Sequence, residues 1–187
     1  MTIGVLALQG DFEAHAAVLA ELGAEPRIVR TPADLVGLEA LVIPGGESTT
    51  MTLGIEREGL AEPLRDLIAA GTPVLGTCAG LIMLDRDHLG VLDVLARRNA
   101  FGRQLQSFET DLALAGDPDP LRAVFIRAPW VHDHGDEVEV LAEVEGHPVA
   151  VRQGNMLAVA FHPELTGDRR LHEWLVERVR DREKEPA

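Results

Sequence analysis

The chain has only one cysteine, Cys78, so it cannot form a disulfide within itself. It also lacks a run of about 18 apolar residues and a basic segment followed by an apolar one, so nothing indicates membrane insertion or export. Basic residues are scarce, with 17 Lys and Arg against 31 Asp and Glu and a net charge of -14. This balance argues against a nucleic acid or an anionic membrane as partner. We therefore expect a cytoplasmic protein that binds a small substrate or another protein.

No internal repeat, linker or low-complexity segment interrupts the 187 residues. The composition, 46% hydrophobic and 26% charged, is that of a globular chain. This length is enough to bury one good core but is short for two. We expect a single domain over residues 1–187.

Apolar runs and helical patterns alternate in the first half of the chain. Strands are expected at residues 2–8, around 27–29, at 38–43 and at 72–75, with helices at 12–22 and 60–70. This order predicts an α/β fold in three layers, with a mainly parallel central sheet flanked by helices. A ligand of such a sheet lies beyond the carboxyl ends of the strands.

The second half of the chain has a different pattern. Short alternating or β-branched segments are expected as antiparallel strands at residues 107–114, 123–127, 138–144, 149–153 and 156–161. They extend or flank the parallel sheet. Residues 168–182 form an expected amphipathic closing helix, and residues 183–187 are expected to fray.

The only cysteine lies in the stretch Gly76-Thr77-Cys78-Ala79-Gly80, between one apolar run at 72–75 and another at 81–84. This pattern is typical of a nucleophile elbow, in which a buried strand ends in a cramped turn and a helix begins at the nucleophile. The free N–H groups at the start of that helix favour a thiolate. The alternative is a small buried hydrophobic residue, which is the usual role of a lone cysteine.

A histidine and a carboxylate follow a second apolar run, in Phe161-His162-Pro163-Glu164. A thiol nucleophile needs a histidine to carry its proton and a third group to orient the imidazole. Taken alone, His-Pro-Glu also fits a surface turn. Together with the cysteine elbow it indicates a Cys78-His162-Glu164 triad.

These two motifs and Pro44-Gly45-Gly46-Glu47-Ser48 resemble the class I, triad-type glutamine amidotransferases. Within that family, longer blocks resemble the glutaminase subunits of pyridoxal 5'-phosphate synthase. The blocks are residues 4–10, 44–51, 76–82, 98–104, 125–129 and 161–166. They occur in order over nearly the whole chain.

The resemblance implies hydrolysis of L-glutamine to L-glutamate and ammonia, without a cofactor or a metal. Cys78 would attack the δ-carbonyl, His162 would protonate the leaving amine and Glu164 would orient His162. The implied oxyanion donors are the N–H groups of the glycine turn and of the residue after the nucleophile, which are Gly45, Gly46 and Ala79.

By the same resemblance, glutamine is held by its α-amino and α-carboxylate groups. The implied contacts are Gly46, Glu47, Ser48, Arg98, Ile126 and Arg127. An arginine offers paired donors to a carboxylate, and Glu47 suits an ammonium. The alternatives are an exposed charge for Arg98, next to Arg97, and an ordinary turn for Gly45-Gly46.

A different site is suggested by His132, Asp133, His134 and Asp136, whose side chains are of the types that bind zinc. No third motif with ligand spacing accompanies them, so we interpret this segment as a solvated loop between two strands. His15 and His172 lie on expected helices and are interpreted as residues at the boundary between core and surface.

Nothing in the chain resembles a synthase domain, so the resemblance implies a synthase subunit on another polypeptide as the recipient of the ammonia. Three alternatives remain: a triad glutaminase that serves another synthase, a related cysteine hydrolase of the same fold, and a non-catalytic interaction protein that kept the fold. The segment Asp85-Arg86-Asp87-His88 is shorter than in many relatives. Partner contacts made by that loop are therefore in question.

Overall fold

The computed structural model describes residues 1–101 and 107–184. Residues 102–104 of the expected block 98–104 lie outside the described residues, and so do residues 185–187 of the expected frayed end. The first half contains β1 (Thr2–Leu6), α1 (Phe12–Glu21), β2 (Glu25–Val29), η1 (Pro32–Leu35), β3 (Ala40–Ile43), α2 (Ser48–Arg57), α3 (Ala61–Ala69), β4 (Val74–Thr77), α4 (Ala79–Leu84) and β5 (Val94–Arg97). The second half contains β6 (Ser107–Leu112), β7 (Leu121–Ile126), β8 (Trp130–His134), β9 (Glu139–Val144), β10 (His147–Gln153), β11 (Met156–Val159), η2 (Pro163–Leu165) and α5 (Arg170–Lys184).

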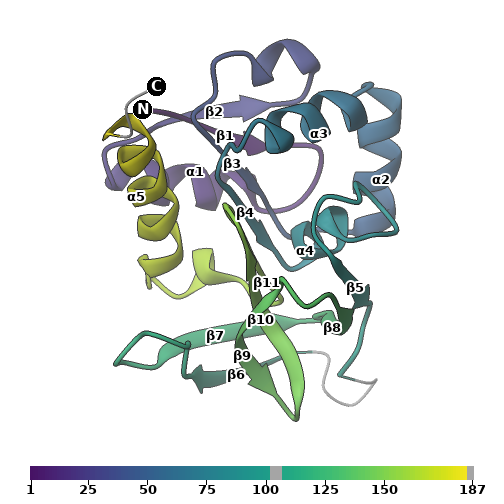
Figure 1. Cartoon of the computed structure of the whole chain (residues 1–187), viewed down its shortest axis with the longest axis vertical. Coiled ribbons are helices and arrows are strands. Elements are labelled where there is room, and N and C mark those ends of the chain that lie inside the picture. Colours follow the sequence, from purple (N-terminus) through teal and green to yellow (C-terminus); the bar gives the residue numbers. More distant parts are fainter. Residues whose placement is uncertain (102–106, 185–187) are drawn as a thin grey trace.

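A seven-stranded sheet runs through the molecule in the order β2-β1-β3-β4-β11-β10-β9 (Figure 1). The pairs from β2 to β11 are parallel, and β10 is antiparallel to both β11 and β9. The α/β fold with a mainly parallel sheet is therefore confirmed. Strand β11 was expected among antiparallel segments, but it pairs parallel with β4, and Val159 lies opposite Thr77.

Two small antiparallel sheets, β5-β8 and β6-β7, flank the large one. Residues of β6 and β7 alternate between exposed positions and half-buried or buried ones, as expected for a hairpin with one solvated face. Among the expected strands, β9 and β10 extend the parallel sheet while β6 and β7 flank it. Strands β5 and β8 were not expected from the sequence.

Side chains that alternate along the strands feed two hydrophobic clusters, one on each face of the sheet. Leu6 and Leu41 pack in the cluster that contains residues of α2, α3 and α4. Their neighbours Val5 and Val42 pack in the cluster that contains residues of α1 and α5. Figure 1 shows α1 and α5 on one side of the sheet and α2, α3 and α4 on the other. Three layers result, as the sequence predicts.

Parallel strands bring their carboxyl ends to one edge of the sheet. The segments that leave this edge are Leu8-Gln9 after β1, Gly45-Gly46 after β3, Cys78 after β4 and His162 after β11. Segments that are far apart in sequence therefore meet at this edge. Within the described residues, no helix has both the length and the apolar character needed to cross a membrane.

Candidate active site

Cys78 lies in the sharp turn between β4 and α4. Its backbone has φ 50° and ψ -106°, a conformation that residues other than glycine rarely adopt. The Cys78 N–H donates to the Val159 carbonyl at 2.8 Å, which ties the turn to β11. Gly80 is required here because an added Cβ would lie 2.0 Å from the Ile43 carbonyl oxygen. The elbow predicted from the glycine spacing is present.

His162 follows β11 and is fixed on two sides. Its N–H donates to the Val124 carbonyl at 2.9 Å, and its ring Nδ1 lies 2.7 Å from Glu164 Oε1. Burial by itself would lower the pKa of His162, but hydrogen bonds and charges from Cys78 and Glu164 outweigh it and raise the pKa to about 10. Because Nδ1 is occupied by Glu164, the other ring nitrogen is the one available to Cys78.

Glu164 lies behind His162 and is almost completely buried, with 1% of its side chain exposed. Burial alone would raise its pKa, but the interactions with His15 and His162 outweigh that effect and lower the pKa to about 2. The carboxylate is therefore charged at neutral pH. A charged partner on Nδ1 holds the imidazole in one orientation and stabilises its protonated form.

These pKa values predict the pH dependence of the site. Because the pKa of His162 is about 10, kcat/KM for glutamine should show no loss from deprotonation of His162 near neutral pH and should fall as the pH rises through about 10. The same pKa shifts contribute to the free energy of unfolding. The contribution of His162 is complete below its ordinary pKa of 6.5 and is lost as the pH rises through about 10. The contribution of Glu164 is lost as the pH falls through about 2. Measuring kcat/KM and thermal unfolding at each pH tests both expectations. A fall of kcat/KM as the pH rises through about 6.5 would contradict the first.

The glycine turn after β3 packs directly against the two reactive side chains. A Cβ on Gly45 would lie 2.6 Å from His162 Cε1 and 3.1 Å from Cys78 Cβ, so only glycine fits. The Gly45 N–H donates to Thr77 Oγ1 at 3.1 Å. Of the expected oxyanion donors, Gly45 is therefore occupied in this conformation. Gly46 and Ala79 both line the cavity beside Cys78.

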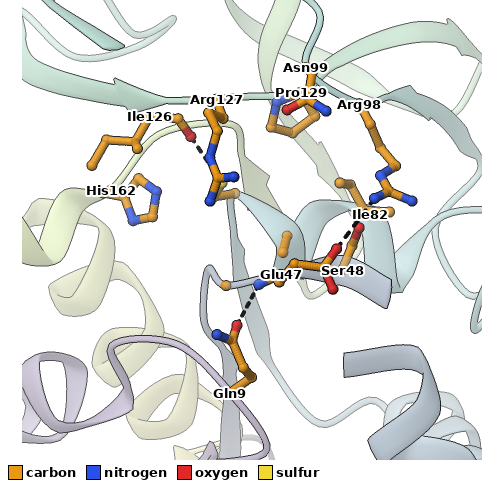
Figure 2. A pocket seen from close by; sticks show the side chains of 13 residues that line it. Gln9, Glu47, Ser48, Ile82, Arg98, Asn99, Ile126, Arg127, Pro129 and His162 are labelled. Atoms are coloured by element: carbon orange, nitrogen blue, oxygen red, sulfur yellow. Dashed lines mark hydrogen bonds and ion pairs between the residues drawn. The ribbon is translucent and has the colours of Figure 1, made fainter. Parts of the chain in front are cut away.

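A cavity of about 270 Å³ opens in front of Cys78, which suits a small substrate. Figure 2 shows His162 and Ile126 on one side of it and Arg98 with Glu47 on the other. The residues that line it are Gln9, Gly46, Glu47, Ser48, Cys78, Ala79, Ile82, Arg98, Asn99, Ile126, Arg127, Pro129 and His162. All site residues expected from the sequence are among them except Gly45 and Glu164, which lie directly behind this surface.

Glu47 and Arg98 are more constrained than the sequence suggests. The Glu47 carboxylate caps α2 by accepting the N–H groups of Thr49 and Thr50, and these bonds, with that from the Thr50 hydroxyl, lower its pKa to about 2. Arg98 Nη2 lies 3.4 Å from Glu47 Oε1 and 3.3 Å from Thr49 Oγ1. Arg98 is therefore held at the cavity by the start of α2.

Sequence reasoning missed several residues of the site. Gln9 accepts the Glu47 N–H with its side-chain oxygen (Figure 2). A Cβ on Gly46 would lie 2.2 Å from that same oxygen. Gln9 follows a buried strand of a parallel sheet, and this position was the available signal. Ile82, Asn99 and Pro129 line the cavity without a comparable signal.

The interpretation of His15 and His172 as boundary residues was wrong, because neither has any exposed surface. His15 lies next to Glu164 and His172 lies next to His15. The spacing of His15 and Leu19, one helical turn apart on α1, was the signal that His15 belongs to the buried face.

The prediction of a loop at this segment was wrong, because His132, Asp133 and His134 belong to strand β8. All three side chains are exposed, and Asp133 forms an ion pair with Arg86. Asp136 lies in the turn that follows. Polar residue types hid the strand, which pairs with β5.

Comparisons with known proteins identify the family of the chain. The chain matches the SNO glutamine amidotransferase family over residues 5–181. It is 54% identical over 187 residues to the pyridoxal 5'-phosphate synthase subunit PdxT of Mycobacteroides abscessus, covering 95% of this chain and 97% of that protein. The PdxT protein of Acidothermus cellulolyticus is 55% identical over 192 residues, with 95% and 93% covered. A crystal structure of a glutamine amidotransferase superimposes with a TM-score of 0.88 at 46% identity, covering 95% of this chain and 98% of that one. The chain belongs to the SNO glutamine amidotransferase family.

Proposed function

We propose that the chain hydrolyses L-glutamine with the Cys78-His162-Glu164 triad and passes the ammonia to the synthase subunit of pyridoxal 5'-phosphate synthase. The observation that carries the chemistry is the meeting of Cys78 and His162 in one cavity, with a buried, charged Glu164 bound to the far side of the imidazole. The pathway is supported by relatives that are about half identical over nearly the whole chain and are subunits of that synthase.

The reaction follows from the positions of the three groups. Cys78 Sγ attacks the δ-carbon of glutamine, and His162 then gives its proton to the amide nitrogen, so that the carbon–nitrogen bond breaks and ammonia leaves. Water attacks the resulting thioester, with His162 taking the proton, and glutamate is released. Glu164 stays ionised throughout and stabilises the imidazolium that forms.

The oxyanion of each tetrahedral intermediate needs donors close to the attacked carbon. We assign this role to the N–H groups of Ala79, which opens α4 directly after Cys78, and of Gly46. Gly45 supports the oxyanion hole indirectly. Because it has no side chain, the glycine turn can lie close to His162.

We assign recognition of the α-amino and α-carboxylate groups to the side of the cavity away from His162. Arg98 lines the cavity and offers its guanidinium to the carboxylate. Ser48 and the Gly46-Glu47 backbone lie beside it. Ile126 at the end of β7 and Arg127 directly after it cover the side chain of glutamine. The carboxylate of Glu47 is already occupied at the start of α2, so its part is to hold Arg98.

The partner is proposed as a synthase subunit on a separate chain, since the described residues form one seven-stranded sheet with two small flanking sheets and covering helices, and the two hydrophobic clusters lie on the two faces of that large sheet. We keep residues 1–187 as one domain in this proposal. The free thiol of Cys78 suits a reducing compartment, so we also keep the cytoplasm as the proposed location.

Ammonia released without a partner would be lost to water, so we expect the isolated chain to be nearly idle and to be activated when the synthase subunit binds. The glycine turn is the proposed switch, because a glycine peptide reorients at low steric cost. Gly46→Val should abolish the stimulated turnover, because a β-branched residue restricts reorientation of the turn, and its Cβ would also displace the Gln9 side-chain oxygen, which lies 2.2 Å from that position.

The measurement is steady-state glutamine hydrolysis with and without saturating synthase subunit, together with copurification of the two chains. Partner binding and labelling of Cys78 by an electrophile should be preserved in Gly46→Val. Equal wild-type rates in the two conditions would remove the case for activation. A fully stimulated Gly46→Val enzyme would place the switch elsewhere.

A further inference from the structure

Two histidines that the proposed reaction does not use are buried behind Glu164. His15 comes from α1 and His172 from α5, and neither has exposed surface. His15 Nδ1 lies 2.9 Å from His172 Nε2, and the two rings are tilted by 44° with centroids 5.1 Å apart. Polar rings are costly to bury unless they are hydrogen-bonded, so this pair needs a reason to be there.

The other nitrogen of His15 faces two groups of the active site. His15 Nε2 lies 3.3 Å from Glu164 Oε2 and 3.3 Å from Thr77 Oγ1. Thr77 in turn accepts the N–H of Gly45 at 3.1 Å. A single ring nitrogen therefore bridges the triad carboxylate and the residue that anchors the glycine turn.

The surroundings assign the proton positions on both rings. Glu164 is a carboxylate, so the His15 Nε2 that faces it carries a hydrogen, and His15 Nδ1 is then an acceptor. His172 must donate to it from Nε2. Its own Nδ1, which has no partner among the described residues, is then a bare acceptor rather than a stranded donor. The reverse assignment would place a lone pair against the carboxylate and strand an N–H.

We propose that His15 is a positioning residue for the triad, which holds Glu164 and the Thr77 hydroxyl through one N–H so that the proton carrier and the glycine turn keep a fixed geometry. The proposal rests on the function proposed above. It adds a residue of α1 that does not line the cavity to the machinery that orients His162.

The geometry explains why the contact matters. Glu164 Oε1 is taken by His162, while Oε2 is buried and makes no hydrogen bond of ordinary geometry among the described residues. Oε2 forms the 3.3 Å ion-pair contact with His15 Nε2, which places the His15 N–H beside an otherwise unpartnered carboxylate oxygen. Without that N–H, the buried carboxylate is under-solvated and turns away from its present position, which loosens its bond to His162. An imidazolium with a weakened partner loses its proton more readily.

The groups that face one another here are few. Glu164 faces His162 and His15, His15 also faces His172 from α5, and His162 also faces Cys78. Burial, with the neighbouring His15, lowers the pKa of His172 to about 3, so His172 is neutral and adds no charge to the network at working pH. The pH dependence of turnover therefore reports on His162 and on the contacts of Glu164.

The test compares His15→Gln, whose amide N–H reaches the position of Nε2–H, with His15→Asn, whose amide is one bond shorter, and with His15→Leu. For His15→Leu and His15→Asn, kcat should fall by about 10- to 100-fold, the range typical of residues that orient a reacting group. KM for glutamine should change little, because His15 does not line the cavity. In these two variants, the loss of kcat at alkaline pH should begin at a lower pH than in the wild type. His15→Gln should restore most of kcat, and its alkaline loss should occur at the wild-type pH.

Leu19→Ala is the matched control. Leu19 lies one turn further along α1 and is fully buried in the hydrophobic cluster that contains residues of α1 and α5. Its side chain has no polar group, so this variant perturbs the packing of α1 without removing a side-chain hydrogen bond. It should keep the wild-type pH profile. The proposal is overturned if folded His15→Leu or His15→Asn turns over at the wild-type rate, if His15→Gln rescues nothing, or if Leu19→Ala shifts the alkaline loss equally. An active Cys78→Ala protein would instead refute the proposed function itself.

Discussion

Cys78→Ala is expected to reduce glutamine hydrolysis to background, measured as glutamate release with saturating synthase subunit. The thiolate is the group that forms the bond to substrate, and alanine leaves nothing that can form the acyl intermediate. The fold should survive, because only the sulfur is removed from a 6%-exposed position whose backbone is held by Val159 and by the fit of Gly80 against Ile43. Far-UV circular dichroism and thermal unfolding check that condition.

Labelling gives an independent measurement of the same residue. Cys78 is the only thiol, so a glutamine-like electrophile should add once per chain in the wild type and not at all in Cys78→Ala, as read by intact-mass spectrometry. His132→Ala on the exposed strand β8 is the matched control, and it should turn over at close to the wild-type rate. Full glutaminase activity in Cys78→Ala would refute the mechanism. A large loss in His132→Ala would return attention to the zinc interpretation.

The sequence predicts the parallel half of the fold well because its signals are local. Short buried runs such as that before Cys78 end in glycine turns, and each such turn marks both a strand end and its place at the edge of the sheet. The cysteine elbow and the His-Pro-Glu segment are recognisable for the same reason. Their meeting in one cavity then follows from parallel pairing, in which β3, β4 and β11 are neighbours.

Helix α2 (Ser48–Arg57) was not predicted because its own residues are weak helix formers. It begins with Ser-Thr-Thr and contains Gly54, which all lower helix propensity. Its start depends on the Glu47 cap, a residue that sequence reasoning assigned to substrate binding. Strand β8 was hidden in a similar way by exposed polar residues, which are stabilised by pairing with β5.

The histidine pair is the part of the site that sequence could not supply. His15 and His172 are 157 residues apart, and each is a single polar residue on a helix with no motif around it. What joins them is the packing of α1 and α5 on the same face of the sheet, directly behind η2, which carries Glu164. A contact of this kind depends on the three-dimensional packing of two helices rather than on any local pattern.

His162→Asn is expected to lose nearly as much activity as Cys78→Ala, on the order of 10⁴-fold or more, because the thiolate and the imidazolium act as one proton-transfer unit. Asparagine keeps a polar group near Nδ1 but has no proton to give to the leaving amine. Glu164→Gln should lose less and keep a measurable rate. Its amide oxygen still accepts from His162, while the charge that raises the His162 pKa to about 10 is gone.

The double variant of Cys78 and His162 decides whether the two residues act together. Effects of groups within one unit do not add, so the Cys78→Ala, His162→Asn protein should be no slower than Cys78→Ala alone when kcat/KM is compared. A loss equal to the product of the single effects would mean that the residues contribute independently. That result would leave the short contact of His162 with Glu164 as a structural feature, since orienting the imidazole matters for turnover only if the imidazole moves the proton that Cys78 chemistry requires.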